Sequence, residues 1–404
     1  MKDIFVIKEF MSDYSHKVTV QFNTHHTELK FSSPYIHWHS AKKLKCFHID
    51  SILAVEHRSE WFNLLIFHCN SIKSYKFLLK SDPKDLTLHL THLLYPIPRS
   101  LLIILNKKSG SGQSEGIFQK HFLPFLQLSP YKYEVIETQE NLFDKVDKNF
   151  TDLIFFSGDG TVNKILTELY SKNPSALNSI SIGVVPTGSR NSLAIELSGK
   201  SLLKPIFHIL KSKFTMCDLM KVELDHEAIL GTTAILIGLG ADIPKEADDI
   251  RGLGPIRFPF VILRKLVRRW KFLQASVKYQ TPEGNLIEKT SNFNGIFLGN
   301  HKAQNILNDE IPYPNASLDS GQLVGIFVEN CSKLQAFRIF WQVMNSGQHL
   351  FNPNAQFFDF ISLSVKAETP MNVSIDGEIF QSCGVQVSVW PKAVRFFGNL
   401  RDNR

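Results

Sequence analysis

The stretch Phe155-Phe156-Ser157-Gly158-Asp159-Gly160-Thr161-Val162-Asn163 joins a buried strand to a helix. The apolar, aromatic run 152–156 before it is typical of a buried strand. After it, apolar residues recur at helical spacing, at Val162, Ile165, Leu166 and Leu169. A Gly-Asp-Gly turn therefore lies where a strand ends and a helix begins, which is where open α/β sheets bind ligands.

The residue types in this turn suit a phosphate ligand. The two glycines allow backbone amides to approach a phosphate without a Cβ in the way. Asp159 would repel that phosphate, so it would hold a metal, orient the backbone or take a proton from a nucleophile. The alternative is an ordinary tight turn in which Asp is chosen for its tolerance of left-handed backbone.

Two further strands end in loops of the same kind. The apolar run 100–105 is followed by the Gly/Ser loop 106–112 and a helix over 115–126, with Lys107 and Lys108 adding positive charge. The strand 179–185 leads into the loop 186–191 and another helix, while 133–138 is a further strand, followed by a helix over 140–149. These patterns predict one rim of a parallel sheet that binds phosphates. The first loop lacks the Gly-Lys-Ser/Thr ending of a Walker motif, which disfavours a P-loop fold.

The composition is that of an ordinary globular protein with several domains. The chain has 404 residues, 43% hydrophobic, and a formal net charge of +7 that suits an anionic partner. Five scattered cysteines without ligand spacing favour reduced thiols and an intracellular protein. No apolar run approaches the roughly 18 residues that span a bilayer, and the N-terminus is too charged for a signal peptide.

Strand patterns dominate both flanks of this central region. Residues 1–98 show several alternating strands, then a helix that Ser81 or Asp82 can cap with Pro83 at its first position. This element order is analogous to a pleckstrin-homology-like module. After residue 275, apolar and polar residues alternate as in the strands of an antiparallel β-sandwich, with a helix near 334–346. We therefore predict three domains: a pleckstrin-homology-like module over 1–98, an α/β parallel-sheet nucleotide-binding domain over 99–225 and a β-sandwich lipid domain over 226–404.

The three loops together resemble those of the diacylglycerol kinase catalytic domain family, most nearly its sphingosine and ceramide kinases. The stretches concerned are 106–112, 157–161 and Pro186-Thr-Gly-Ser-Arg-Asn191. Ile237-Gly-Leu-Gly-Ala-Asp242, the Arg251–Phe258 stretch and Asp376-Gly-Glu378 also match, in the order typical of the family.

The resemblance implies a fold like that of NAD kinase and diacylglycerol kinase, with ATP and Mg²⁺ as cofactors. It implies that Asp159 takes the proton from a lipid's primary hydroxyl. Asp242 and Asp218 would bind the lipid head group, although an ordinary structural Asp at the start of a strand is an equal alternative for Asp218. No motif supplies metal ligands directly, so Mg²⁺ would enter with ATP. The resemblance places the nucleotide at Asn106, Lys108, Ser109, Gly110, Thr138, Ser157, Gly158, Gly160, Thr161, Gly188, Ser189, Asn191, Arg251, Arg257, Asp376, Gly377 and Glu378.

Three departures from the family pattern leave alternatives open. Arg190 stands where Gly is usual, Lys164 replaces a common Glu, and Pro244 stands near a second head-group Asp of sphingosine kinases. We expect a kinase acting on a sphingoid base to give a sphingosine 1-phosphate-type product. The alternatives are a ceramide or diacylglycerol kinase, an enzyme like NAD kinase, or a catalytically degenerate lipid-binding relative.

The stretch 257–273 interleaves apolar residues with Arg and Lys and predicts a basic amphipathic helix. It would line a lipid gate at a membrane, or alternatively pack on the core with a solvated basic side. We expect a membrane lipid as substrate, an anionic membrane surface as partner and no nucleic acid, and we leave a homodimer open. The expected location is cytoplasmic with peripheral membrane association.

Overall fold

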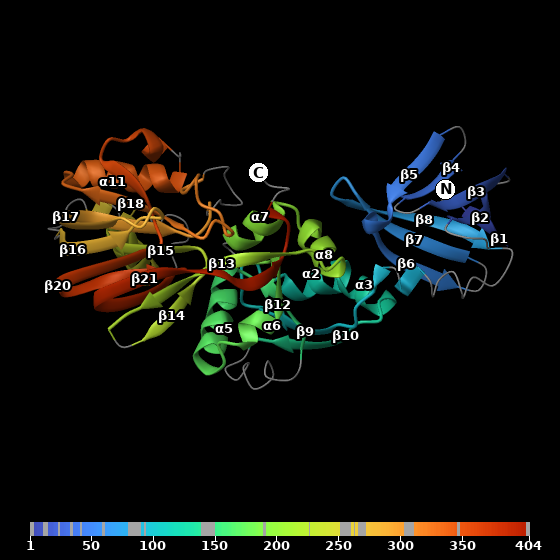
Figure 1. Cartoon of the computed structure of the whole chain (residues 1–404), viewed down its shortest axis with the longest axis horizontal. Coiled ribbons are helices and arrows are strands. Elements are labelled where there is room, and N and C mark those ends of the chain that lie inside the picture. Colours follow the sequence, from blue (N-terminus) through green and yellow to red (C-terminus); the bar gives the residue numbers. More distant parts are fainter. Residues whose placement is uncertain are drawn as a thin grey trace.

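The computed structural model describes most of the chain. It covers residues 4–10, 15–22, 25–32, 35–40, 43–58, 61–79, 90–92, 94–138, 150–188, 191–225, 227–250, 260–261, 263–265, 272–302, 311–345 and 348–400. These residues form three lobes in a row, with the α/β lobe between the N-terminal and C-terminal β-rich lobes (Figure 1).

The N-terminal lobe is an eight-stranded sheet in the order β5-β4-β3-β2-β1-β8-β7-β6. Its neighbours pair antiparallel except β1 and β8, which run parallel. Residues 90–92 and 94 are helical, while the predicted helix start at Ser81 lies outside the described residues. The pleckstrin-homology-like assignment stays a prediction. The strands are β1 (Ile4–Phe10), β2 (Ser15–Phe22), β3 (His25–Ser32), β4 (Tyr35–Ser40), β5 (Lys43–His48), β6 (Ile52–Arg58), β7 (Trp61–His68) and β8 (Ser71–Leu79), with a 3-10 turn η1 (Ile49–Ser51).

The central lobe has four parallel strands in the order β10-β9-β11-β12. Alternate residues of β9 and β11 enter two separate cores. Ile103 packs with Phe118 and Phe122 on one face, while Leu102 packs with Val162 and Leu166 on the other. Such two-sided burial explains the continuous apolar runs. The elements are β9 (Ser100–Leu105), β10 (Lys132–Glu137), β11 (Asp152–Ser157), β12 (Ser181–Pro186), α2 (Ser114–His121), α3 (Leu123–Leu128), α5 (Asp159–Lys172), α6 (Ala176–Ser179), α7 (Ser192–Ser198) and α8 (Leu203–Leu210). Ser179, predicted to begin the strand, instead ends α6, and the helix predicted over 140–149 lies outside the described residues.

The C-terminal lobe is antiparallel and continues the central sheet. Strand β21 pairs antiparallel with β20 and β13, and its end pairs in parallel with β12, with Ser181 opposite Arg395. The elements are β13 (Phe214–Glu223), β14 (Ala228–Gly231), β15 (Ala234–Gly238), α9 (Leu239–Asp248), β16 (Leu273–Gln280), β17 (Leu286–Gly299), β18 (Leu323–Glu329), α11 (Lys333–Asn345), η3 (Gln348–Phe351), β19 (Ala355–Phe360), β20 (Ser362–Ile375) and β21 (Glu378–Phe397). The predicted boundary at 225/226 falls between β13 and β14, yet the chain returns to the central lobe through β21.

The N-terminal lobe packs directly on the central one. Residues from both lobes share one hydrophobic core, in which the rings of Phe67 and Phe207 stack with centroids 4.7 Å apart. The Lys211 ammonium donates to the carbonyl oxygen of Ile52 at 3.0 Å, and its burial lowers the pKa of this amine to about 8. The two lobes therefore form one packed unit.

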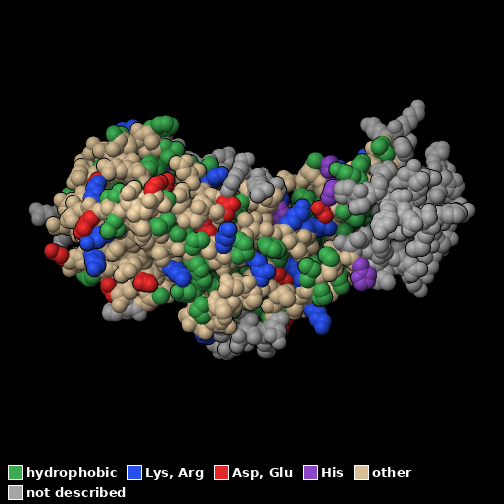
Figure 2. All heavy atoms as spheres, viewed as in Figure 1, with side chains coloured by type: hydrophobic (Ala, Val, Ile, Leu, Met, Phe, Trp, Pro, Cys, Tyr) green, Lys and Arg blue, Asp and Glu red, His purple; other side chains and the backbone are tan. Residues whose placement is uncertain are grey.

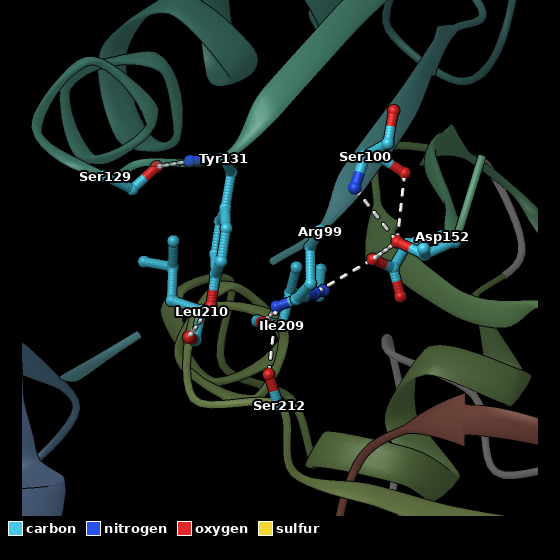
Figure 3. A network of polar contacts seen from close by, with 9 residues as sticks. Arg99, Ser100, Ser129, Tyr131, Asp152, Ile209, Leu210 and Ser212 are labelled. Carbon is cyan, nitrogen blue, oxygen red and sulfur yellow. Dashed lines mark hydrogen bonds and ion pairs between the residues drawn. The ribbon is translucent and has the colours of Figure 1, made fainter. Parts of the chain in front are cut away.

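A buried ion pair anchors the entry into the central sheet. Arg99 donates through Nε to Asp152 at 2.8 Å and through Nη1 to the carbonyl oxygen of Ile209 at 2.6 Å (Figure 3). Its guanidinium also lies over the rings of Tyr131 and Phe397, at 4.7 and 4.8 Å. These contacts tie the start of β9 to β11, to the end of α8 and to the end of β21.

Candidate functional site

Three loops meet at the carboxyl ends of β9, β11 and β12, and they approach one another most closely at Gly188. A Cβ on Gly188 would lie 2.3 Å from the Cα of Gly158 and 3.0 Å from the Oγ of Ser109. A Cβ on Gly110, which has a φ of +58°, would lie 2.4 Å from the carbonyl oxygen of Thr187. Backbone-to-backbone contact of this kind requires glycine at both positions.

Two asparagines stabilise these loops by side-chain hydrogen bonds, Asn106 between the first loop and α5 and Asn191 within the third loop. Asn106 donates through Nδ2 to the Oγ1 of Thr161 at 2.8 Å and accepts from the amide of Lys108 at 3.1 Å. Asn191 accepts from the amide of Gly188 at 3.0 Å and donates to its carbonyl oxygen at 2.7 Å. Both side chains therefore stabilise the loops themselves.

Asp159 begins α5 and points at the first turn of α7. Its Oδ2 accepts from the backbone amide and hydroxyl of Ser192 at 2.9 and 2.7 Å, and its Oδ1 from the amide of Leu193 at 3.3 Å. The residue is only 6% exposed. Burial raises the pKa of this carboxyl to about 6, opposed by the Ser192 and Leu193 hydrogen bonds and reinforced by the negative charge of Asp376.

Asp376 belongs to the two-residue turn that joins β20 to β21. Asp376 and Gly377 have φ values of 49° and 98°, as expected for an Asp-Gly hairpin turn. The carboxylate accepts from the amide and hydroxyl of Thr232, both at 2.6 Å, and from the amides of Thr233 and Ala234 at 2.8 and 2.9 Å. Burial raises the pKa of Asp376, against these hydrogen bonds. The C-terminal lobe thus brings a second carboxylate close enough to influence Asp159.

The remaining predicted nucleotide residues differ in position and exposure, and some are not described. Ser157 is buried and donates to the carbonyl oxygen of Gly158 at 3.1 Å, while Thr138 follows β10, beside β9. Lys108, Gly110, Gly160, Gly377 and Glu378 are exposed, and Ser109 and Thr161 are half-buried. Ser189, Arg190, Arg251 and Arg257 lie outside the described residues.

The positive charge predicted at the first loop is partly used within the protein. Lys107 forms ion pairs with Glu115 at 2.9 Å and Glu137 at 2.6 Å, and these contacts raise its pKa. The charge that Lys107 adds to the first loop is therefore offset by two carboxylates. Lys108, which is exposed beside it, keeps its predicted role of adding positive charge.

Asp242 lies on α9 and already holds an ammonium group. The carboxylate accepts from the Nδ2 of Asn372 at 2.6 Å and pairs with the Nζ of Lys265 at 3.2 Å. Lys265 also pairs with Glu246 at 2.8 Å, and Arg264 pairs with the same Glu246.

The basic stretch 257–273 is described at residues 260–261, 263–265 and 272–273. Its Arg264 and Lys265 point to carboxylates of α9, whereas Phe260 and Leu263 are 50% and 62% exposed. Arg264 and Lys265 thus pair with half-buried carboxylates of α9, and the basic amphipathic helix at a membrane stays a prediction, because most of 257–273 lies outside the described residues.

Asp218 is fully buried and its oxygens bind backbone amides. Oδ1 accepts from the amide of Lys392 at 2.7 Å and Oδ2 from the amide of Gly321 at 2.6 Å. Burial raises the pKa of Asp218, opposed by these two hydrogen bonds. The contacts connect β13 to the turn at Gly321 and to an irregularity of strand β21 at Lys392, both with left-handed backbone. They match the structural alternative for Asp218.

Sequence reasoning missed three residues of the site. Ser192 holds Asp159, Thr232 holds Asp376, and Thr187 has a buried hydroxyl with no hydrogen-bond partner among the described residues. Ser192 could have been found as a hydroxyl residue in the first turn of a helix that opens from a Gly-rich loop. Nothing local marks Thr232, because its partner is 144 residues away.

The residues present fit a nucleotide. The rim combines glycine contacts that only Cβ-free backbone permits, an orphaned hydroxyl at Thr187, and the start of α5, whose N-cap is Gly158. Backbone amides at a helix start are suited to phosphates. Within the described ranges, no group of three His, Cys, Asp or Glu residues could hold a metal ion, and no helix is long and apolar enough to cross a membrane.

Comparison with known proteins agrees with this geometry. Residues 100–222 match the model of the diacylglycerol kinase catalytic domain, and residues 233–398 match the YegS C-terminal NAD kinase beta sandwich-like domain. A putative diacylglycerol kinase from Bacillus anthracis str. Sterne has a similar fold, with a TM-score of 0.57 at 19% identity over 74% of this chain and 95% of that one.

Two curated relatives show the same similarity in sequence. Sphingoid long-chain bases kinase 1 of Arabidopsis thaliana is 32% identical over 170 residues, or 39% of this chain and 22% of the relative. Ceramide kinase of Mus musculus is 23% identical over 185 residues, or 40% of this chain and 35% of the relative. The chain thus spans about a fifth to a third of these relatives. The chain thus carries a region of the diacylglycerol kinase catalytic domain family over residues 100–222, followed by a region like the YegS C-terminal NAD kinase beta sandwich-like domain over 233–398.

Proposed function

We propose that this chain is an ATP-dependent lipid kinase that phosphorylates the primary hydroxyl of a sphingoid base. The main support for the proposal is Asp159, a buried carboxylate with a pKa of about 6. It lies where the three Gly-rich loops after β9, β11 and β12 meet. Such a group is largely ionised at neutral pH yet basic enough to accept a proton in a transition state.

The protein groups have separate tasks in this reaction. Mg·ATP, when bound, supplies the phosphoryl group and neutralises its charge. Asp159 accepts the hydroxyl proton while the lipid oxygen bonds to the γ-phosphorus, and the bond from that phosphorus to the bridging oxygen breaks, its electron pair leaving with ADP. Oδ1 suits the proton, since it has one long contact of 3.3 Å whereas Oδ2 has two short ones. The loop glycines and the start of α5 position the phosphates.

The environment of Asp242 supports a sphingoid base as the acceptor. The Lys265 ammonium beside this carboxylate is the same chemical group as the ammonium of a sphingoid base. A substrate amine that replaces Lys265 would keep the ion pair, whereas ceramide and diacylglycerol carry no such charge. The similarity to a sphingoid long-chain base kinase supports the same choice, and the similarity to a ceramide kinase keeps ceramide as the second candidate.

A kinase assay with radiolabelled ATP tests the proposal. Purified protein is given sphingosine, ceramide or diacylglycerol in mixed micelles, and we expect label on sphingosine first. Asp159→Asn should lower the turnover by at least about 100-fold, because general base catalysis is typically worth that much. Glu288→Gln is the matched control, since it makes the same carboxylate-to-amide change on an exposed strand residue.

Two outcomes would change the assignment. Label on ceramide or diacylglycerol alone would make one of these lipids the substrate while keeping the kinase. No label on any lipid from a protein that still binds Mg·ATP would overturn the activity and favour a degenerate relative.

A further inference from the structure

The outer face of α11 and η3 exposes large apolar side chains that the proposed catalytic site does not use. Leu334 and Trp341 are 71% and 46% exposed on α11, and Leu350 and Phe351 are 40% and 87% exposed on η3. Leu334, Arg338 and Trp341 are spaced i, i+4 and i+7, so they share one face of the helix. Figure 2 shows hydrophobic and basic side chains together at this end of the C-terminal lobe.

The exposed face is held rigidly from beneath. Ala336 and Ile339 of α11 are buried in a core shared with β17 and β18. Asn352 donates to the Oε1 of Gln342 at 3.1 Å, and a ring nitrogen of the buried His349 lies 2.9 Å from the carbonyl oxygen of Pro312. The exposure of Phe351 therefore belongs to a folded, fixed turn, and the patch is a preformed surface.

The charge of this surface complements an anionic bilayer. Residues 330–358 contain no Asp or Glu, whereas Lys333 and Arg338 are basic and Arg338 is exposed. A tryptophan and other large apolar side chains beside a basic residue form the combination that inserts at the boundary between lipid head groups and acyl chains.

The same helical layer carries the residues proposed to receive the lipid. Leu239 and Ile243 of α9, Val261, and Ala336 and Ile339 of α11 pack into one core on one face of the antiparallel sheet. Asp242 lies on α9, so α11 and η3 extend the layer that holds the proposed head-group carboxylate.

We propose that the face formed by Leu334, Arg338, Trp341, Leu350 and Phe351 docks on the surface of an anionic lipid bilayer. The choice of a bilayer rests on the proposed lipid kinase function, together with the charge of the face. Docking would place the layer containing Asp242 against the membrane in which a sphingoid base is dissolved.

The test is co-sedimentation of the full-length protein with vesicles of phosphatidylcholine alone or mixed with phosphatidylserine. The double variant Leu334→Ser/Phe351→Ser should lower partitioning to mixed vesicles at least tenfold. Arg338→Gln should lower it about fivefold on mixed vesicles only, because one basic residue near an anionic surface contributes about that factor. The matched control is Ile97→Ser/Leu286→Ser, which removes two side chains that are 62% and 74% exposed elsewhere.

The kinase assay separates this proposal from the proposed function. The Leu334→Ser/Phe351→Ser variant should keep full activity on sphingosine in micelles and lose it on sphingosine in vesicles. If no lipid is phosphorylated but vesicle binding still depends on the face, the activity fails and the docking surface stands. The proposal would be overturned if the double variant partitioned to mixed vesicles as strongly as the wild-type protein does. A second outcome would also overturn the proposal. In it, light scattering shows that the wild-type protein is a dimer, and the double variant is a monomer that binds vesicles as well as the wild type does.

Discussion

At the scale of single residues, the surroundings of Asp159 shift the pKa of its carboxyl group in opposite directions. Burial raises its pKa, and the hydrogen bonds from Ser192 and Leu193 lower it, with about 6 as the result. A general base must be ionised, so we expect kcat/KM to be constant above this pH and to fall tenfold per unit below it. The protonated form that accumulates below pH 6 cannot accept the substrate proton.

The Ser192 hydroxyl provides a direct test of this balance. Ser192→Ala removes a 2.7 Å hydrogen bond to the ionised form, so the pKa of Asp159 should rise. The acid limb of kcat/KM should move to higher pH by about one unit, since a hydrogen bond to a charged group is worth about 1.5 kcal/mol or more. Ser171→Ala, which removes an exposed hydroxyl at the end of α5, should leave the limb in place. An unshifted limb in Ser192→Ala would mean that another group controls it.

At the scale of elements, the loops after β9, β11 and β12 form one rim because their backbones touch. The closest backbone contacts are made at Gly110, Gly158 and Gly188. Glycine is needed here because the loop backbones approach each other closely. At Gly110 the left-handed φ is a second reason.

A methyl group at Gly188 should disrupt this rim. The new Cβ of Gly188→Ala would lie 2.3 and 2.6 Å from backbone atoms of Gly158, which forces the second and third loops apart. We expect the Kd for Mg·ATP to rise more than tenfold, measured by calorimetry. Gly116→Ala is the control, because its Cβ meets nothing within 4 Å on helix α2, where alanine also favours the helix. Unchanged affinity in Gly188→Ala would show that the nucleotide does not use this rim.

At the scale of the whole molecule, the last strand connects the two halves of the proposed enzyme. Strand β21 pairs with β20 in the C-terminal lobe and with β12 in the central one. The Asp376-Gly377 turn precedes β21, and the negative charge of Asp376 raises the pKa of Asp159. The C-terminal lobe therefore tunes a carboxylate of the central lobe.

Removal of the Asp376 charge tests this coupling between lobes. Asp376→Asn should lower the pKa of Asp159 and move the acid limb of kcat/KM to lower pH, opposite to the shift from Ser192→Ala. A loss of stability alone would lower activity without moving the limb. Asp225→Asn is the matched control, because Asp225 also accepts backbone amides, at 2.7 and 3.1 Å from Cys383 and Gly384. A limb that stays in place in Asp376→Asn would contradict the coupling.

The sequence by itself determined the local features of this protein. Strands, the Gly-rich loops and the helices that follow them depend on side-chain periodicity and on turn residues, which are properties of neighbours in the chain. Asp159, Asn106, Asn191 and Gly188 could be identified in this way. The Asp-Gly turn at 376 could also be identified from its residue types.

Only the tertiary structure decided which polar groups meet. Lys107 is bound to Glu115 and Glu137, Lys265 to Asp242, and Asp218 to two backbone amides. Partners such as Thr232 and Asp376 are far apart in the chain. Short-range patterns carry no information on such pairs, because an ionic or hydrogen-bonded contact depends on how whole elements pack and on what that packing removes from water.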